Sequence, residues 1–107
     1  ACTILVDDTS VCSCLMFAVD CHGRTIETVE GLQTDENLHP IQAAYVEHGA
    51  IQCGYCTPGM VMQTKHLLDK NPNPTEGEIR RGLEGNVCRC TGYLKIFDAV
   101  ADAAQRS

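Results

Sequence analysis

Two short cysteine pairs constrain this chain of 107 residues more than any other feature. Cys53 and Cys56 form a C-x2-C pair, Cys88 and Cys90 form a C-x-C pair, and residues 57–87 separate them. Close pairs of this kind supply thiolates to structural zinc sites and to iron–sulfur clusters alike, so the number of ligands does not distinguish the two. We therefore interpret the four cysteines as the ligands of one metal centre.

Each pair stands before a signal for the start of a helix. Thr57 is the expected N-cap after Cys56, and Pro58 takes the first helical position, where its missing N–H costs nothing. Cys90 directly precedes a periodic apolar run over about 93–104. Helix N-termini favour negative charge, so both pairs are expected where a cluster of thiolates is stabilised.

Composition and charge argue against several classes of protein. A net charge of −6 leaves no basic stripe for nucleic acid. No apolar run approaches the ~20 residues of a membrane span, and the missing signal-peptide pattern predicts a cytoplasmic protein. Eight cysteines also permit a secreted disulfide scaffold. They are bunched, however, and the chain from residue 36 onward has the pattern of amphipathic helices, which disfavours that scaffold.

The first part of the chain has the pattern of strands. Residues 3–6 are β-branched and apolar, residues 7–10 have turn chemistry, residues 11–19 form a second apolar segment, and residues 24–29 alternate with a period of two. Two or three strands do not stand alone in water. This part is therefore expected to be the remainder of a larger sheet.

Four helices are expected after a polar linker at residues 32–39. The first begins at Pro40 and ends at Gly49, the second ends at Asn71, and the third opens with a capping box at Thr75. Their apolar faces comprise Ile41, Ala44, Tyr45 and His48 in the first, Met60, Val61, Thr64, Leu67 and Leu68 in the second, Ile79 and Leu83 in the third, and Tyr93, Ile96, Phe97, Val100 and Ala104 in the fourth.

The order of helix, cysteine loop and helix occurs twice. This predicts two helical hairpins that face each other, with the metal where the two loops meet. We interpret His48 as a packed or hydrogen-bonded side chain and not as a ligand. The methionines of the second helix are expected to fill the core.

The segments around both cysteine pairs resemble a known family. Residues 52–60, QCGYCTPGM, and residues 85–93, GNVCRCTGY, resemble the two signature loops of the iron–sulfur subunit or domain of the xanthine oxidase family of molybdenum hydroxylases. Residues 30–32, 38–42 and 71–75 are also similar to that family. The resemblance covers essentially the whole chain.

This resemblance implies an α+β fold in two parts. Residues 1–31 would be the C-terminal part of a ferredoxin-like (β-grasp) domain that holds a second [2Fe-2S] cluster, and residues 32–107 a four-helix [2Fe-2S]-binding domain. Cys2 and Cys14 resemble the third and fourth ligands of the second cluster, so the first two are expected before Ala1. Asp8 stands where the family has a glycine, and aspartate also forms turns.

The resemblance also assigns roles to individual residues. Cys53, Cys56, Cys88 and Cys90 would hold the cluster nearest the molybdenum cofactor, and Gln52 and Cys90 would contact its pterin. Two further cysteines have no counterpart in the family's ligand sets and are expected to be buried free thiols, namely Cys12 and Cys21.

The function implied by the resemblance is electron transfer. A molybdopterin-binding large subunit would oxidise a substrate, and electrons would pass through this chain towards FAD on a medium subunit. The chain lacks a nucleophile–base pair, a phosphate loop and a nucleotide fingerprint, so it is expected to perform no substrate chemistry itself. The alternative is a zinc-stabilised interaction module. Residues 14–19 resemble the carbon monoxide dehydrogenase branch, and purines, aldehydes and N-heterocycles also remain open as substrates.

Overall fold

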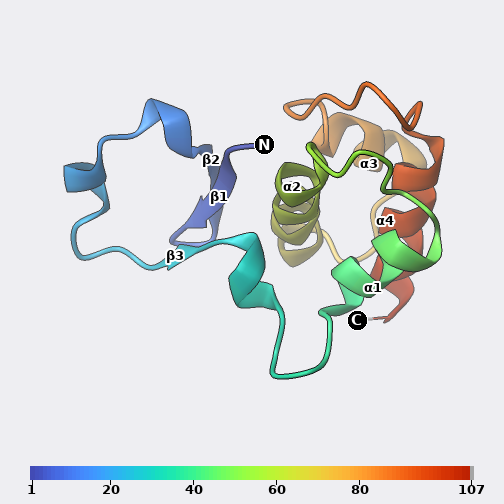
Figure 1. Ribbon diagram of the computed structural model, residues 1–107, viewed down its shortest axis with the longest axis horizontal. Coiled ribbons are helices and arrows are strands. Elements are labelled where there is room, and N and C mark those ends of the chain that lie inside the picture. The colour runs from blue at the N-terminus through green and yellow to red at the C-terminus, as the bar shows by residue number, and fades with distance from the viewer. Residues whose placement is uncertain (107) are drawn as a thin grey trace.

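The computed structural model describes residues 1–106 and has an α+β fold, as expected. Figure 1 shows a small sheet beside a group of helices. The strands are β1 (Thr3–Val6), β2 (Thr9–Cys12) and β3 (Ile26–Glu27), and the helices are α1 (Pro40–Glu47), α2 (Thr57–Lys70), α3 (Glu76–Gly82) and α4 (Leu94–Arg106). Short 3-10 turns cover Ser13–Leu15, Ala18–Cys21 and Val29–Leu32.

The sheet is antiparallel with the order β2-β1-β3. Asp7 and Asp8 connect β1 to β2 with φ values of 50° and 67°. A two-residue hairpin needs positive φ at both positions, which aspartate tolerates better than most residues, so Asp8 is accommodated without a glycine. The expected alternation over residues 24–29 gives only the two-residue strand β3, and the second apolar segment leaves the sheet after Cys12.

Local capping explains where two of the helices begin. The His39 side chain accepts a hydrogen bond from the Ile41 N–H at the start of α1, and the Gln42 Oε1 accepts one from the His39 N–H. The expected capping box of α3 is present, with Thr75 and Glu78 exchanging the equivalent hydrogen bonds. Such boxes satisfy backbone N–H groups that a helix start leaves without partners.

The core lies between the four helices and extends to the sheet. The predicted inner faces of the helices are confirmed by buried Tyr45, Met60 and Ile96. Met62 is also buried although it was not assigned to the predicted face, so both methionines of α2 are core residues, as expected. Tyr45 donates or accepts a hydrogen bond of 2.9 Å with the Thr64 hydroxyl, which satisfies both buried groups. Burial raises the pKa of Tyr45 far above its ordinary value.

The sheet packs on α2 through β1. Leu5 on β1 is only 1% exposed and belongs to the same core as the helices, so the two parts are joined by apolar packing (Figure 1).

His48 is hydrogen-bonded to Asp102 on α4, as its interpretation as a structural side chain requires. Among residues 1–106, no helix combines the length and apolar character that a membrane crossing needs.

Candidate metal centre

The first cysteine loop is a tight turn that leads into α2. Gly54 has a φ of 85°, a conformation that glycine adopts without strain. The Tyr55 N–H points at the Cys53 sulfur at 3.4 Å. Cys56 itself caps α2, because its carbonyl accepts the Met60 N–H at 3.0 Å. The expectation that Thr57 is the N-cap was therefore wrong by one residue.

The second loop surrounds the sulfur of Cys88 with hydrogen-bond donors. The Thr91 hydroxyl lies 3.1 Å from this sulfur and the Thr91 N–H lies 3.4 Å from it. The Cys88 N–H donates to the Tyr93 hydroxyl at 2.9 Å, and the Tyr93 N–H donates to the Thr91 hydroxyl at 3.1 Å. These bonds fold residues 88–93 into a compact turn, so the direction of the Cys88 side chain is determined by Thr91 and Tyr93.

Cys90 does not directly precede a helix, contrary to expectation. Helix α4 begins at Leu94, after a turn in which Gly92 and Tyr93 have φ values of 70° and 73°. The N-terminal amides of α4 are therefore separated from Cys90 by three residues, 91–93. Only the first pair, through Cys56, stands at the start of a helix. At the second pair, the hydrogen-bond donors near sulfur are backbone and side-chain groups of the turn and not the amides of a helix N-terminus.

The two loops meet, and their cysteines pair across the junction. Besides burial, the Cys88 thiol raises the pKa of Cys56, and the Cys53 thiol raises the pKa of Cys90, so each interacting pair takes one thiol from each loop. Within residues 1–106, no three side chains of the His, Cys, Asp and Glu types converge on a single metal-ion position. The four sulfurs thus lie as two pairs, and a [2Fe-2S] cluster requires four cysteines, two on each iron.

The environments of the four thiols are unequal. Burial and the contact with Cys88 raise the pKa of Cys56 to about 11. Burial acts in the same direction on Cys88, but hydrogen bonds from Thr91 and from the Cys90 N–H outweigh it and lower the pKa of Cys88 to about 7. The hydrogen bond with Cys53 raises the pKa of Cys90. Cys88 is thus more readily deprotonated than Cys56 or Cys90, and the thiolate is the form that binds metal.

A second sulfur pair lies at the sheet. The Cys2 and Cys14 sulfurs are 3.4 Å apart, and a hydrogen bond with the Cys14 backbone lowers the pKa of Cys2 to about 7. The Cys12 thiol also contacts Cys2. Cys12 is exposed and Cys21 is partly exposed, so the expectation of buried free thiols was wrong for both. Strand β2 is an edge strand, and little covers its outer residues.

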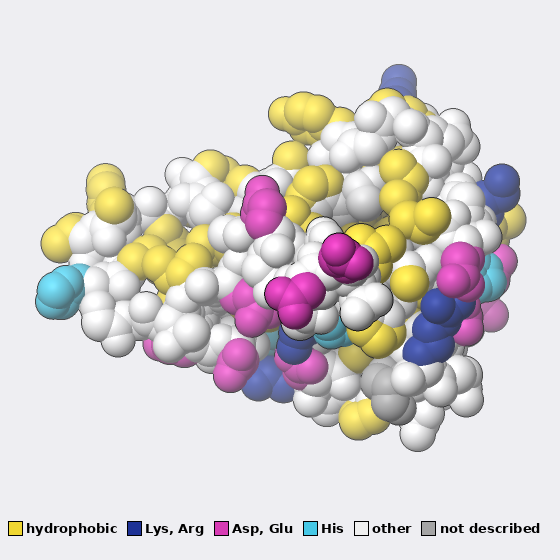
Figure 2. Space-filling view, turned by 60° about the horizontal axis from the view of Figure 1, so that its bottom comes forward, with side chains coloured by type: hydrophobic (Ala, Val, Ile, Leu, Met, Phe, Trp, Pro, Cys, Tyr) yellow, Lys and Arg dark blue, Asp and Glu magenta, His cyan; other side chains and the backbone are white. Residues whose placement is uncertain are grey.

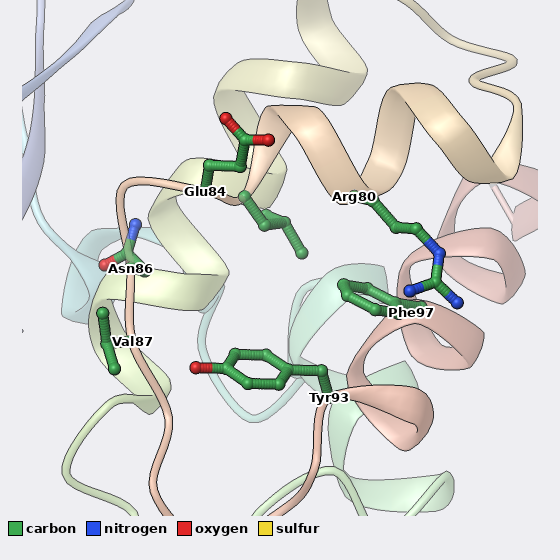
Figure 3. A pocket seen from close by; sticks show the side chains of 7 residues that line it. Arg80, Glu84, Asn86, Val87, Tyr93 and Phe97 are labelled. Carbon is green, nitrogen blue, oxygen red and sulfur yellow. The ribbon is translucent and has the colours of Figure 1, made fainter.

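Residues around the loops were partly missed by sequence reasoning. Thr91 and Tyr93 were read only as turn and helix residues, although their positions just after a cysteine pair are a signal for donors to sulfur. Tyr93 also lines a cavity of about 240 Å³ with Arg80, Asn86 and Phe97 (Figure 3). In Figure 3 the Tyr93 hydroxyl points towards the segment that carries Val87, next to Cys88. Gln52 is exposed beside Cys53.

Comparison with known proteins identifies the class of protein to which this site belongs. Residues 28–101 match the family described as "[2Fe-2S] binding domain". The chain belongs to this family and, with it, to the iron–sulfur subunits of xanthine oxidase-type molybdenum hydroxylases, as the resemblance implied. The zinc alternative receives no support from these matches.

Particular relatives are similar over nearly the whole chain. The nicotinate dehydrogenase small FeS subunit of Eubacterium barkeri is 48% identical over 99% of the chain and 68% of the relative. The nicotine 6-hydroxylase small subunit of Paenarthrobacter nicotinovorans is 52% identical over 96% and 62%. Quinoline 2-oxidoreductase of Pseudomonas putida 86 gives a TM-score of 0.91 at 47% identity, over 99% of this chain and 68% of that one. The chain thus spans about two thirds of the length of these relatives.

Proposed function

We propose that this chain transfers electrons in a molybdenum hydroxylase, with Cys53, Cys56, Cys88 and Cys90 as the ligands of a [2Fe-2S] cluster. The observation that carries the proposal is that both loops turn backbone or side-chain donors towards cysteine sulfur, Tyr55 towards Cys53 and Thr91 towards Cys88, while Cys56 interacts with Cys88 and Cys53 with Cys90. Each iron would then take one thiolate from each loop. When bound, such a cluster accepts and releases one electron at a time.

The residues of the chain hold and tune the site in distinct ways. Thr91 donates to the Cys88 sulfur, and such hydrogen bonds stabilise additional negative charge on the ligands. The start of α2 places its dipole beside Cys56. Cys53 and Cys90 are exposed, which supports a route for electrons at this face. Gln52 would contact the pterin of the partner, together with Cys90.

We propose that Cys2 and Cys14 supply two ligands of the second cluster, in a ferredoxin-like part over residues 1–31 that precedes the four-helix part over 32–107. The sulfur–sulfur distance of 3.4 Å supports their sharing one iron. We also propose a cytoplasmic location, because thiols that serve as cluster ligands stay reduced there.

The partner would be a molybdopterin-binding large subunit on the side of the two loops, with FAD on a medium subunit. Tyr55 and Val87 next to the cysteines are 79% and 76% exposed, and Leu94 is 64% exposed. Large exposed apolar side chains gathered at one place are typical of interfaces. The relatives are named after three different substrates, nicotinate, nicotine and quinoline. Similar chains in enzymes with different substrates support a chain that does not bind the substrate itself. The likeness of residues 14–19 to the carbon monoxide dehydrogenase branch stays a prediction.

The test is purification of the chain followed by measurement of iron, acid-labile sulfide and the EPR spectrum after reduction. We expect a brown protein with a [2Fe-2S] signal, and a colourless zinc protein would contradict the proposal. For the partner face, Val87→Asp should weaken co-purification of a molybdenum-containing subunit. Asn73→Asp, which adds the same charge on the exposed connection between α2 and α3, is the matched control.

A further inference from the structure

A buried hydrogen bond connects the strand of one sulfur pair with the loop of the other. The Thr3 hydroxyl donates to Oδ1 of Asn86 at 3.2 Å, and both side chains are only 8% exposed. Thr3 directly follows Cys2, and Asn86 stands two residues before Cys88. The bond therefore joins backbone segments that lie 83 residues apart in sequence and that each carry a proposed metal ligand.

The first turn of α2 closes this contact from a third side. A Cβ atom on Gly59 would overlap with Oδ1 of Asn86 and would lie 3.2 Å from the backbone nitrogen of Ala1. Gly59 is buried and stands three residues after Cys56. The absence of a side chain at this position is thus what allows the loop before Cys88 and the strand after Cys2 to approach α2 together.

The backbone of Asn86 is itself held in place. Its N–H donates to the Leu83 carbonyl at 3.0 Å, so the residue is anchored to the end of α3. Figure 3 shows Asn86 at the edge of the cavity, on the same chain segment as Val87. Because both the backbone and the side chain of Asn86 are held by hydrogen bonds, the loop before Cys88 has little freedom to move relative to β1.

We propose that Asn86 is the positioning residue that fixes the separation and orientation of the two [2Fe-2S] sites. It does so by its hydrogen bond to Thr3 and its close packing on Gly59. This inference rests on the proposed function, because it takes Cys2 and Cys88 as ligands. Without the bond, β1 itself contacts the helices through apolar packing, which is not directional. The far end of the β1–β2 hairpin is bonded to α2 separately, where His66 Nδ1 lies 3.3 Å from the Ser10 nitrogen and 3.2 Å from the Asp8 carbonyl oxygen. A directional, buried hydrogen bond defines the position of β1 along the loop before Cys88.

The test uses two variants that disturb the contact by different routes and one that preserves it. Thr3→Val removes the donor and keeps the shape, Thr3→Ser restores a hydroxyl, and Gly59→Ala forces the Asn86 side chain away. Gly77→Ala is the matched control, since a Cβ on that helical glycine meets nothing within 4 Å. The first readout is hydrogen–deuterium exchange of the β1 amides. The second is the magnetic interaction between the two reduced clusters, which depends steeply on their separation. It is measured by EPR on the longer chain that also supplies the two other ligands of the Cys2 and Cys14 site.

In Thr3→Val, the amide hydrogens of β1 should exchange about threefold to tenfold faster than in the wild type, as expected for the loss of one buried hydrogen bond. Gly59→Ala should do the same, and both should alter or abolish the EPR interaction while each cluster keeps its own signal. Thr3→Ser and Gly77→Ala should resemble the wild type in both readouts. Unchanged exchange, or faster exchange with an unchanged EPR interaction, would overturn the proposal. A wild-type protein without clusters would overturn the proposed function instead, whatever the exchange rates.

Discussion

Hydrogen bonds to sulfur distinguish the four cysteines of the two loops. The Cys88 sulfur accepts hydrogen bonds from the Thr91 hydroxyl and N–H, and the pKa of Cys88 falls to about 7. Burial raises the pKa of Cys56 to about 11. Ligands that differ so much are expected to contribute differently to the potential of a bound cluster, because donors to sulfur stabilise the more negative, reduced form.

Thr91→Val is expected to lower the reduction potential of the cluster held by the two loops. The substitution removes the hydroxyl that lies 3.1 Å from the Cys88 sulfur and leaves the volume nearly unchanged. The shift should reach up to about 60 mV, the one-electron equivalent of the ~1.4 kcal/mol upper range for one hydrogen bond. A potentiometric titration followed by EPR measures it. Thr57→Val, at the start of α2, is the control, and a potential that stays the same in both variants would contradict this role of Thr91.

Cys90→Ser and Cys12→Ser are expected to separate a ligand from a free thiol. Serine keeps an oxygen ligand, so Cys90→Ser should retain some cluster with a changed potential and slower reduction by substrate in the assembled enzyme. Cys12→Ser should leave the signals and the rate unchanged, although its thiol touches Cys2. EPR and reduction kinetics are the measurements. Loss of a cluster signal in Cys12→Ser, with Cys90→Ser intact, would show that the ligands are misassigned.

At the scale of secondary-structure elements, α1 and α4 are joined by an ion-pair network at their ends. Arg106 on α4 pairs with Glu47 on α1 and, at 2.7 Å, with Asp102, which also binds His48 at 2.8 Å. Arg106 lowers the pKa of Glu47, and Arg106 followed by His48 lowers the pKa of Asp102. Because the groups are 29% to 60% exposed, salt weakens the network.

Arg106→Gln is expected to lower thermal stability at neutral pH and to have no effect in strong acid. A carboxylate whose pKa is depressed in the folded state stabilises the fold above its ordinary pKa, near 4.5 for Glu47 and 3.8 for Asp102. This stabilisation is lost as the pH falls through the folded-state values. Thermal melts of the wild type and the variant against pH should therefore converge at low pH. Arg81→Gln, which removes the same charge from exposed α3, should show no such convergence.

At the scale of the whole molecule, the sheet is the less covered part. Leu15, Phe17 and Val19 in the segment that follows β2 are 83%, 77% and 75% exposed. Figure 2 shows hydrophobic side chains gathered at the surface of the part that extends to the left. Three short strands bury one face on α2, and their outer residues have no further strand over them in residues 1–106. That these strands belong to a larger sheet stays a prediction.

Iron stoichiometry is expected to depend on how much of the ferredoxin-like part is present. A chain of verified residues 1–107 offers one complete set of four thiolates and should bind about two iron atoms. A longer chain that supplies the two other ligands of the Cys2 and Cys14 site should bind about four. Iron and sulfide assays with mass-verified protein make the measurement. Four irons on the shorter chain would contradict the ligand sets.

Local patterns in the sequence were sufficient for most elements. The capping box at Thr75, the proline at the start of α1 and the apolar periodicity of α2 and α4 act within a few residues, so they could be recognised without the fold. The α+β class and the metal type came from the resemblance of both cysteine loops to a known family, because the spacing of the cysteines suits zinc and iron–sulfur ligation alike. The division into residues 1–31 and 32–107 stays a prediction.

Only the tertiary structure determined which groups meet across the chain. The pairing of Cys56 with Cys88, the exposure of Cys12 and the bond between Thr3 and Asn86 depend on how α2, the second loop and β1 approach one another. Spacing along a sequence describes neighbours within a turn or a strand, whereas these contacts result from the packing of segments far apart in sequence. For that reason the cysteines were identifiable from the sequence alone, and their partners and hydrogen-bond donors were not.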